Sequence, residues 1–121
     1  MNRYKELKVW QEAINLSVEI YQLTKTFPLE EKYGLTSQIN RSGVSISSNI
    51  AEGAGRNSDK EFIHFLSIAM GSSCELESQL IIGEKLNFFS KEELNNKVAK
   101  INQIQNMLFK LQEVLKEKTY S

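Results

Sequence analysis

The sequence predicts an all-α protein, folded as an antiparallel, up-down-up-down four-helix bundle, and three observations carry this prediction. Apolar residues recur every three or four positions in four segments, which is the spacing of a helix with a buried face. The sequences at 58–61 and 90–93 read Ser-x-x-Glu, the form of a capping box that begins a helix. No proline-rich or glycine-rich linker separates the segments, and short connections between long helices favour antiparallel neighbours.

Length and composition narrow the class of protein. A chain of 121 residues suits a single domain, 1–121, with one core. Lys plus Arg and Asp plus Glu number 15 each, so no net charge draws the protein to nucleic acid or to a membrane. One cysteine excludes an internal disulfide, and no apolar stretch is long enough to cross a bilayer. We therefore expect a cytoplasmic protein that does not enter membranes.

The first helix is expected over 5–26, and it carries two adjacent apolar seams, more than one neighbouring helix needs. Pro28 ends it, because proline disfavours helical backbone at Phe27. The second helix follows a short turn at 29–33 and stops around 53–55, where glycine tolerates a left-handed cap. The two seams of the first helix are Leu7, Trp10, Ile14, Ser17, Tyr21 and Thr24, and Val9, Ala13, Leu16, Ile20 and Leu23.

The second helix is poor in charge. Its apolar positions keep helical spacing, but most of its other residues are small, whereas an exposed helix face would carry Glu and Lys. Small residues allow a neighbouring helix to approach closely, and serine hydroxyls can bond the carbonyl one turn earlier. We expect this helix to be covered by its own bundle and by a further subunit, with Ser45 and Ser48 as candidate oligomer contacts.

The third helix begins at Ser58 and the fourth at Ser90. The third helix, like the first, carries two seams, so the apolar surface exceeds what a lone bundle can bury, and we expect a stable homo-oligomer. The seams of the third helix are Phe62, Leu66, Ala69, Ser73, Leu76 and Leu80, and Phe65, Ile68, Ser72, Gln79, Ile82 and Leu86. The seam of the fourth is Leu94, Val98, Ile101, Ile104, Leu108, Leu111 and Leu115.

Residues that could carry catalysis are few. His64 forms a Glu-x-x-His pair with Glu61, but a di-iron site of the ferritin type needs two such pairs, and the chain has no second histidine. Cys74 is expected to fill core space. The segment 53–56 could cradle an anion only if Asp59 and Glu61 did not already occupy the next helix start. We expect no catalytic, cofactor-binding or metal-binding residue, and no enzyme.

A polar line on the second helix has two interpretations. It can be a hydrogen-bonded network, inside the bundle or across a subunit contact, or a recognition surface for RNA or a protein. The network is favoured, because two arginines are few for a surface that binds phosphates. The line is Gln38, Arg41, Ser45, Asn49 or Ser48, Glu52 and Arg56. The residues that we expect to contact a partner or RNA are Arg41, Asn49, Glu52 and Arg56, followed by Lys97 and Lys100 on the fourth helix.

Several of these segments carry a family pattern. Phe27-Pro28 to Tyr33-Gly34-Leu35, then Gln38 and Arg41, and then Ser45-Ile46 and 48–53 together resemble the four-helix-bundle proteins of the 23S rRNA-intervening-sequence family. The chain departs from that pattern at Ser47, where the family often has proline, and at Ser42-Gly43, where it often has two alanines. The resemblance implies homopentamers, and it implies kinship with accessory proteins of diversity-generating retroelements, which bind a reverse transcriptase and its RNA.

Two function classes follow. The first is a non-enzymatic, homo-oligomeric adaptor or scaffold, with a pentamer as the best single count, that binds a protein or RNA partner, a reverse transcriptase among them. The second is a direct RNA-binding protein associated with rRNA intervening sequences. A basic stripe with interleaved aromatics would favour the second class. The sequence lacks one, since Phe88 and Phe89 have no arginines beside them.

Overall fold

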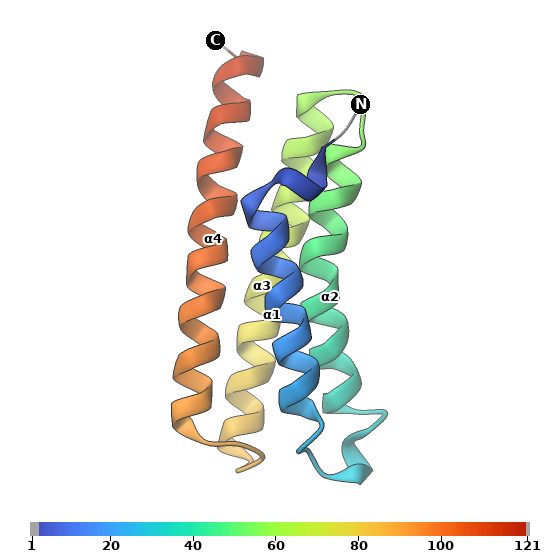
Figure 1. Cartoon of the computed structure of the whole chain (residues 1–121), viewed down its shortest axis with the longest axis vertical. Helices are drawn as coiled ribbons and strands as arrows, with labels where there is room; N and C mark the ends of the chain where they lie inside the picture. The colour runs from blue at the N-terminus through green and yellow to red at the C-terminus, as the bar shows by residue number, and fades with distance from the viewer. Residues whose placement is uncertain (1–2, 121) are drawn as a thin grey trace.

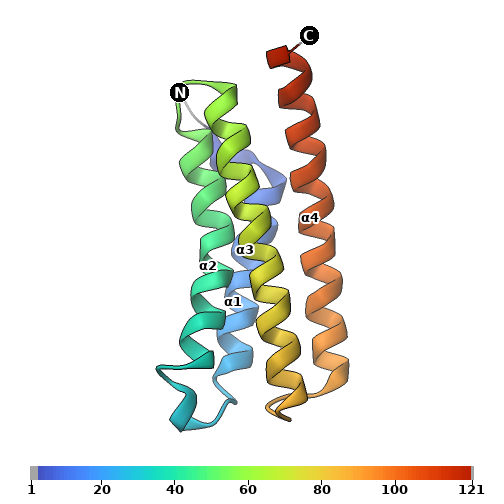
Figure 2. The same cartoon turned by 180° about the vertical axis from the view of Figure 1, so that it is seen from behind.

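The computed structural model describes residues 3–120, except the side chain of Tyr120. Four α-helices form the described part: α1 (Lys8–Thr24), α2 (Leu35–Ala54), α3 (Asp59–Lys85) and α4 (Lys91–Tyr120). Figures 1 and 2 show that successive helices run in opposite directions around one core, with the two chain ends at the same end of the bundle. The predicted four-helix bundle is therefore confirmed. No helix among the described residues combines the length and the apolarity that crossing a membrane requires.

The first helix is shorter than the sequence predicts. A 3-10 turn, η1 (Tyr4–Glu6), precedes α1, and α1 ends at Thr24 instead of continuing to the proline. The Thr26 hydroxyl donates to the Leu23 carbonyl at 2.8 Å, and the Phe27 amide donates to the Thr24 carbonyl at 3.0 Å. These turn bonds replace the helical ones before Pro28, which then begins the second 3-10 turn, η2 (Leu29–Glu31).

Both predicted capping serines are confirmed. The Ser58 hydroxyl accepts a hydrogen bond from the Glu61 amide at 3.2 Å, and the Ser90 hydroxyl accepts one from the Glu93 amide at 3.1 Å. The left-handed glycine cap after α2 is wrong. Gly55 has a φ of −82° because its amide continues the helical pattern by donating to the Ala51 carbonyl. Among the described residues, the positive φ of 65° belongs to Asn87, in the turn between α3 and α4.

The core takes one seam from each long helix. Leu66, Leu76 and Leu80 of the first α3 seam are fully buried, as predicted, and Ile101 and Leu108 of α4 face them in the same cluster. The second α3 seam is divided: Ile68, Ile82 and Leu86 are exposed, Gln79 is buried, and Phe65 and Ser72 contact α2. The core is Val9, Ala13, Leu16, Ile20, Leu23, Phe27, Ile39, Ile46, Ile50, Leu66, Ala69, Leu76, Leu80, Leu94, Ile101, Ile104, Leu108 and Leu115.

The small residues of α2 allow α3 to pack very close to it. A Cβ added at Gly53 would lie 2.6 Å from the Cβ of Phe65 and 3.0 Å from Cδ1 of Phe62, both on α3. Farther along the same contact, the Ser45 and Ser72 hydroxyls are 2.8 Å apart. The close packing of α3 therefore explains why α2 is rich in small residues, since larger side chains would force the two helices apart.

Two glycine-to-alanine substitutions test this close approach. Gly53→Ala should lower the free energy of unfolding by about 1 to 3 kcal/mol, because the new methyl group overpacks the contact with Phe65. Gly71→Ala is the control, since the same methyl group on exposed α3 surface would meet nothing within 4 Å. It should stabilise the protein by about 0.5 to 1 kcal/mol through helix propensity. Urea unfolding at one protein concentration measures both, and equal effects would contradict the close approach.

Candidate functional site

The polar line on α2 divides into bonded and unbonded members. Asn49 points back along the helix, and its amide nitrogen donates to the Ser45 carbonyl at 2.8 Å and to the Ser45 hydroxyl at 3.0 Å. Ser45 in turn shares a hydrogen bond with Ser72 of α3. These residues form the predicted hydrogen-bonded network, and its partners belong to the same chain. Ser48, by contrast, is exposed.

Arg56, beyond the end of α2, is held by three groups. Its guanidinium lies 2.9 Å from a carboxylate oxygen of Glu52 and 3.8 Å from one of Glu61, and it stacks 4.8 Å from the centre of the Phe65 ring. The side chain remains 42% exposed, so these contacts are partly solvated and each is weak. Together they fix the turn between α2 and α3 and neutralise the charge of Arg56.

A groove with a volume of 410 Å³ runs between α2 and α3, and we call it the polar groove. It is lined by Gln38, Arg41, Ser42, Ser45, Glu75 and Gln79. On its floor, the Ser42 hydroxyl lies 2.9 Å from the amide oxygen of Gln79 and 3.2 Å from a carboxylate oxygen of Glu75. A hydroxyl carries one proton, so it can donate to one of these acceptors at a time. Glu75 and Gln79 therefore share the single hydroxyl proton of Ser42.

Arg41 stands at this groove as a free cation. It is exposed, and among the described residues its guanidinium forms no ion pair, although Glu75 lines the same groove. A guanidinium offers five donors in a plane, and Glu75 offers acceptors nearby. The polar groove can thus hydrogen-bond a partner that presents both a carboxylate or carbonyl and a donor group.

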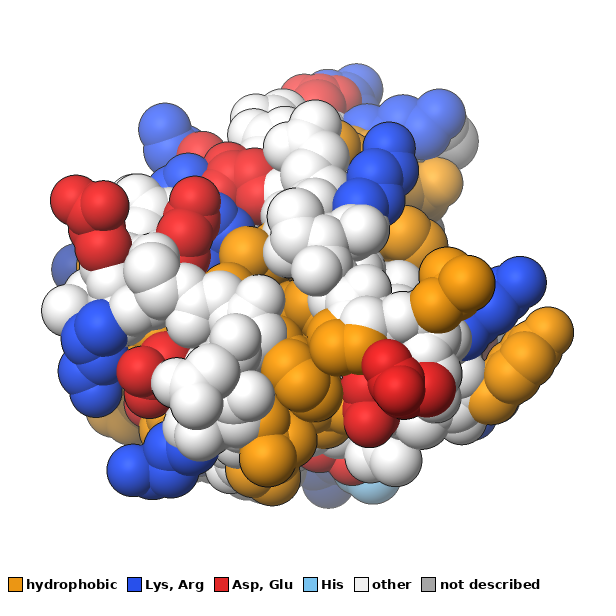
Figure 3. Space-filling view, turned by 90° about the horizontal axis from the view of Figure 1, so that it is seen from below, with side chains coloured by type: hydrophobic (Ala, Val, Ile, Leu, Met, Phe, Trp, Pro, Cys, Tyr) orange, Lys and Arg blue, Asp and Glu red, His pale blue; other side chains and the backbone are white. Residues whose placement is uncertain are grey.

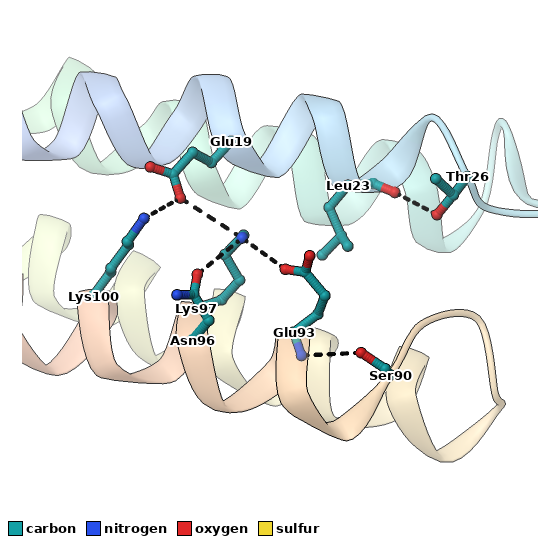
Figure 4. A network of polar contacts seen from close by, with 8 residues as sticks. All are labelled: Glu19, Leu23, Thr26, Ser90, Glu93, Asn96, Lys97 and Lys100. Carbon is teal, nitrogen blue, oxygen red and sulfur yellow. Dashed lines mark hydrogen bonds and ion pairs between the residues drawn. The ribbon is translucent and has the colours of Figure 1, made fainter.

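The two lysines predicted as further contacts lie instead in an ion cluster between α1 and α4 (Figure 4). The Lys97 side chain is only 9% exposed, and its ammonium lies 3.0 Å from Glu93 and 3.6 Å from Glu19. Lys100 pairs with the same Glu19 carboxylate. The structure therefore gives these charges partners within the chain and leaves little of Lys97 for an external phosphate.

Sequence reasoning missed the burial of Lys97, although a signal was present. Lys97 lies between Leu94 and Ile101 on the apolar seam of α4, and it follows Glu93 by one helical turn. A lysine at such a position either passes its charge to the surface or finds carboxylates beside it. Here it finds one on its own helix and one on α1.

The reactive side chains lie apart from one another. His64 is exposed and packs edge-on against the Phe65 ring, 5.4 Å between centroids. The prediction that Cys74 fills core space is wrong, because Cys74 is exposed on α3, where its sulfur lies 3.7 Å from the Gln105 amide nitrogen. Among the residues that the structure describes, no three His, Cys, Asp or Glu side chains are grouped to hold a metal ion.

Comparisons with known proteins agree with this fold. The profile of the 23S rRNA-intervening sequence protein family matches residues 5–110. A crystal structure of a protein of unknown function from the S23 ribosomal protein family of Bacteroides thetaiotaomicron superposes with a TM-score of 0.81 and 27% sequence identity. The match covers 87% of this chain and 95% of that one. Among curated proteins there is no match.

The ion cluster predicts unequal effects of its two lysines. Lys97→Ala should lower the free energy of unfolding by about 1 to 2 kcal/mol, because it removes a buried ammonium and its packed stem and leaves Glu93 without this ion pair, while Glu19 keeps Lys100. Lys100→Ala should cost less than about 1 kcal/mol, since its side chain is 40% exposed and its pair is partly screened. Urea unfolding monitored by circular dichroism compares them, and a larger loss for Lys100→Ala would contradict this assignment.

Proposed function

The chain belongs to the 23S rRNA-intervening sequence protein family, and from this premise we propose that it is a non-enzymatic, homo-oligomeric adaptor that binds a protein partner through the polar groove. The single observation that carries the proposal is Arg41, an exposed guanidinium without an ion-pair partner among the described residues, beside Glu75 and Gln79, which share the one hydroxyl proton of Ser42. A charge-assisted hydrogen bond from the Arg41 guanidinium to a partner contributes more binding free energy when the contact excludes water.

The balance of charge favours a protein partner over RNA. Arg41 shares the polar groove with the opposite charge of Glu75, whereas an RNA-binding groove is uniformly positive. Arg56 is paired with two carboxylates, and Lys97 and Lys100 are paired across α1 and α4. Few cations near α2 are left to release counterions from a phosphate backbone. A protein surface that offers one acid and one hydrogen-bond donor matches the groove better.

The alternative function is direct RNA binding. Its support is again Arg41, because an unpaired guanidinium also suits a phosphate. The two functions differ in how affinity depends on salt and on this one residue, so they can be separated with purified components.

An RNA-binding measurement distinguishes the two. The wild-type protein, Arg41→Gln and Lys110→Gln are titrated into a labelled 23S rRNA fragment and an unrelated RNA of equal length, over a series of salt concentrations. Lys110 is a matched control, as an exposed cation of α4 without an ion pair in the described chain. For the adaptor we expect weak binding of both RNAs and small, equal losses in the two variants. Tight binding that Arg41→Gln alone abolishes would replace the adaptor with the RNA-binding alternative.

A cross-linking experiment tests the partner. A photoreactive residue at Gln38, on the rim of the polar groove, should give a discrete cross-linked protein in the native cell, and Arg41→Glu should remove it. The same residue placed at Lys110, with Lys110→Glu as the charge control, should give no such product. A cross-linked species that persists in Arg41→Glu would show that the groove does not recognise the partner.

Self-association is measured directly by native mass spectrometry. The purified protein should be a homo-oligomer at micromolar concentration, and the family resemblance makes five the expected number of copies. The exposed apolar side chains of α1, α2 and η2 supply the driving force. A monomer would refute the assembly, whereas a dimer or tetramer would refute only the count.

A further inference from the structure

We propose that the α1–α2 face of one copy binds the connection between α1 and α2 of a second copy, with Tyr33, which follows η2, as the inserted side chain. This inference rests on the proposed self-association and names the two surfaces that make it. We call the first the apolar groove, formed by Ile14, Val18 and Tyr21 of α1 and Val44 of α2, with Lys25 on its rim. We call the second the end knob, formed by Leu29 and Tyr33.

The apolar groove is an unfilled surface. Its volume is 380 Å³, and Val18, Tyr21 and Val44 are 53%, 47% and 40% exposed. Ser17 also lines it and is 8% exposed, and its hydroxyl oxygen is buried without a hydrogen-bond partner in the described part of the chain. The lining of the apolar groove also includes the polar side chains of Gln22 and Lys25, so a fitting occupant is apolar along its body and polar at its tip.

The end knob has these properties. Leu29 and Tyr33 are each 88% exposed, the highest value among the exposed large apolar side chains of the described residues. Seen from this end of the bundle, hydrophobic side chains are gathered on the surface among charged ones (Figure 3). Tyrosine has a large apolar ring and a hydroxyl at its tip, which suits an apolar groove with Gln22 and Lys25 in its lining.

One pair of charges on the two surfaces is complementary. Lys25 lines the apolar groove and Glu30 lies next to Leu29 of the end knob, and neither forms an ion pair among the described residues. Lys32, two positions after Glu30 in the sequence, lies over the Tyr33 ring of its own chain, 5.4 Å from the ring centre. Glu31, the other acid of the turn, is already used, because its carboxylate accepts from the Leu35 amide at 3.2 Å. In the proposed contact, Tyr33 of a second copy packs in the apolar groove, and Glu30 of that copy lies near Lys25.

The two surfaces do not overlap on one chain, so a copy can use both at once. The apolar groove lies on α1 and α2, and the knob lies on the turn that joins them. A contact between two different surfaces passes from copy to copy and closes into a ring when the rotation allows. The polar groove between α2 and α3 is lined by other residues, so this contact leaves it accessible to a partner.

The test compares two valines of matched exposure. Val18 in the groove is 53% exposed and Val114 on α4 is 54% exposed, so glutamate at either position disturbs folding little. We expect Val18→Glu and Tyr33→Ala each to raise the concentration at which the assembly half-dissociates by at least about tenfold, while Val114→Glu changes nothing. Analytical ultracentrifugation measures the association, and circular dichroism checks that all variants keep the wild-type helicity.

Mixing the variants provides the decisive arm. Val18→Glu retains an intact knob and Tyr33→Ala retains an intact groove, so an equimolar mixture regains one complete contact and should form a species that neither variant forms alone. An assembled wild type whose Val18→Glu and Tyr33→Ala variants stay assembled would overturn this inference and leave the adaptor standing. A mixture that stays monomeric would also overturn it. A monomeric wild type would instead remove the self-association on which the adaptor depends.

Discussion

The close approach of α2 to α3 is the constraint on which the rest of the bundle depends. Gly53 leaves no room for a methyl group against Phe65, and the paired hydroxyls of Ser45 and Ser72 hold the same contact farther along. Because the small face of α2 is filled by α3, its other flank is left to α1, where Gly43 lies against Ile20. The close contact between α2 and α3 thus places α1 on the other flank of α2, with one groove on each flank.

Ion pairs join α1 and α4 on the side of the bundle away from the α2–α3 contact. Lys97 brings a charge into the seam between α1 and α4, and it is tolerated because Glu19 and Glu93 meet it there (Figure 4). Arg56, Lys97 and Lys100 have carboxylate partners within the chain, whereas Arg41 is exposed and has no ion pair among the described residues.

The sequence predicts the elements of this fold better than their partners. Capping serines and the Leu66 seam follow from local spacing, and the structure confirms them. Spacing alone does not identify the neighbour that covers a helix face, because a serine at a contact within the bundle and a serine at a contact between subunits give the same sequence pattern. For that reason Ser45 could be read as an oligomer contact, although the structure shows it bonded to α3. The general tendency of free cysteines to be buried led to the wrong prediction for Cys74, whereas the helical seam correctly includes its buried neighbour Ser73.

A polar groove lies on one flank of α2 and an apolar groove on the other, and we propose a protein partner for the first and a second copy of the chain for the second. The central claim is that copies meet through the connection between α1 and α2, which includes Tyr33, and the α1–α2 flank of a neighbour, and that the small face of α2 packs inside its own bundle. An experimental structure of the assembled protein tests it most directly. The account predicts the Tyr33 ring seated against Val18 and Val44 of a neighbouring copy, with Ser45 still bonded to Ser72 of its own chain. Tyr33 in solvent, with Ser45 and Ser48 at the contact between copies, would contradict it.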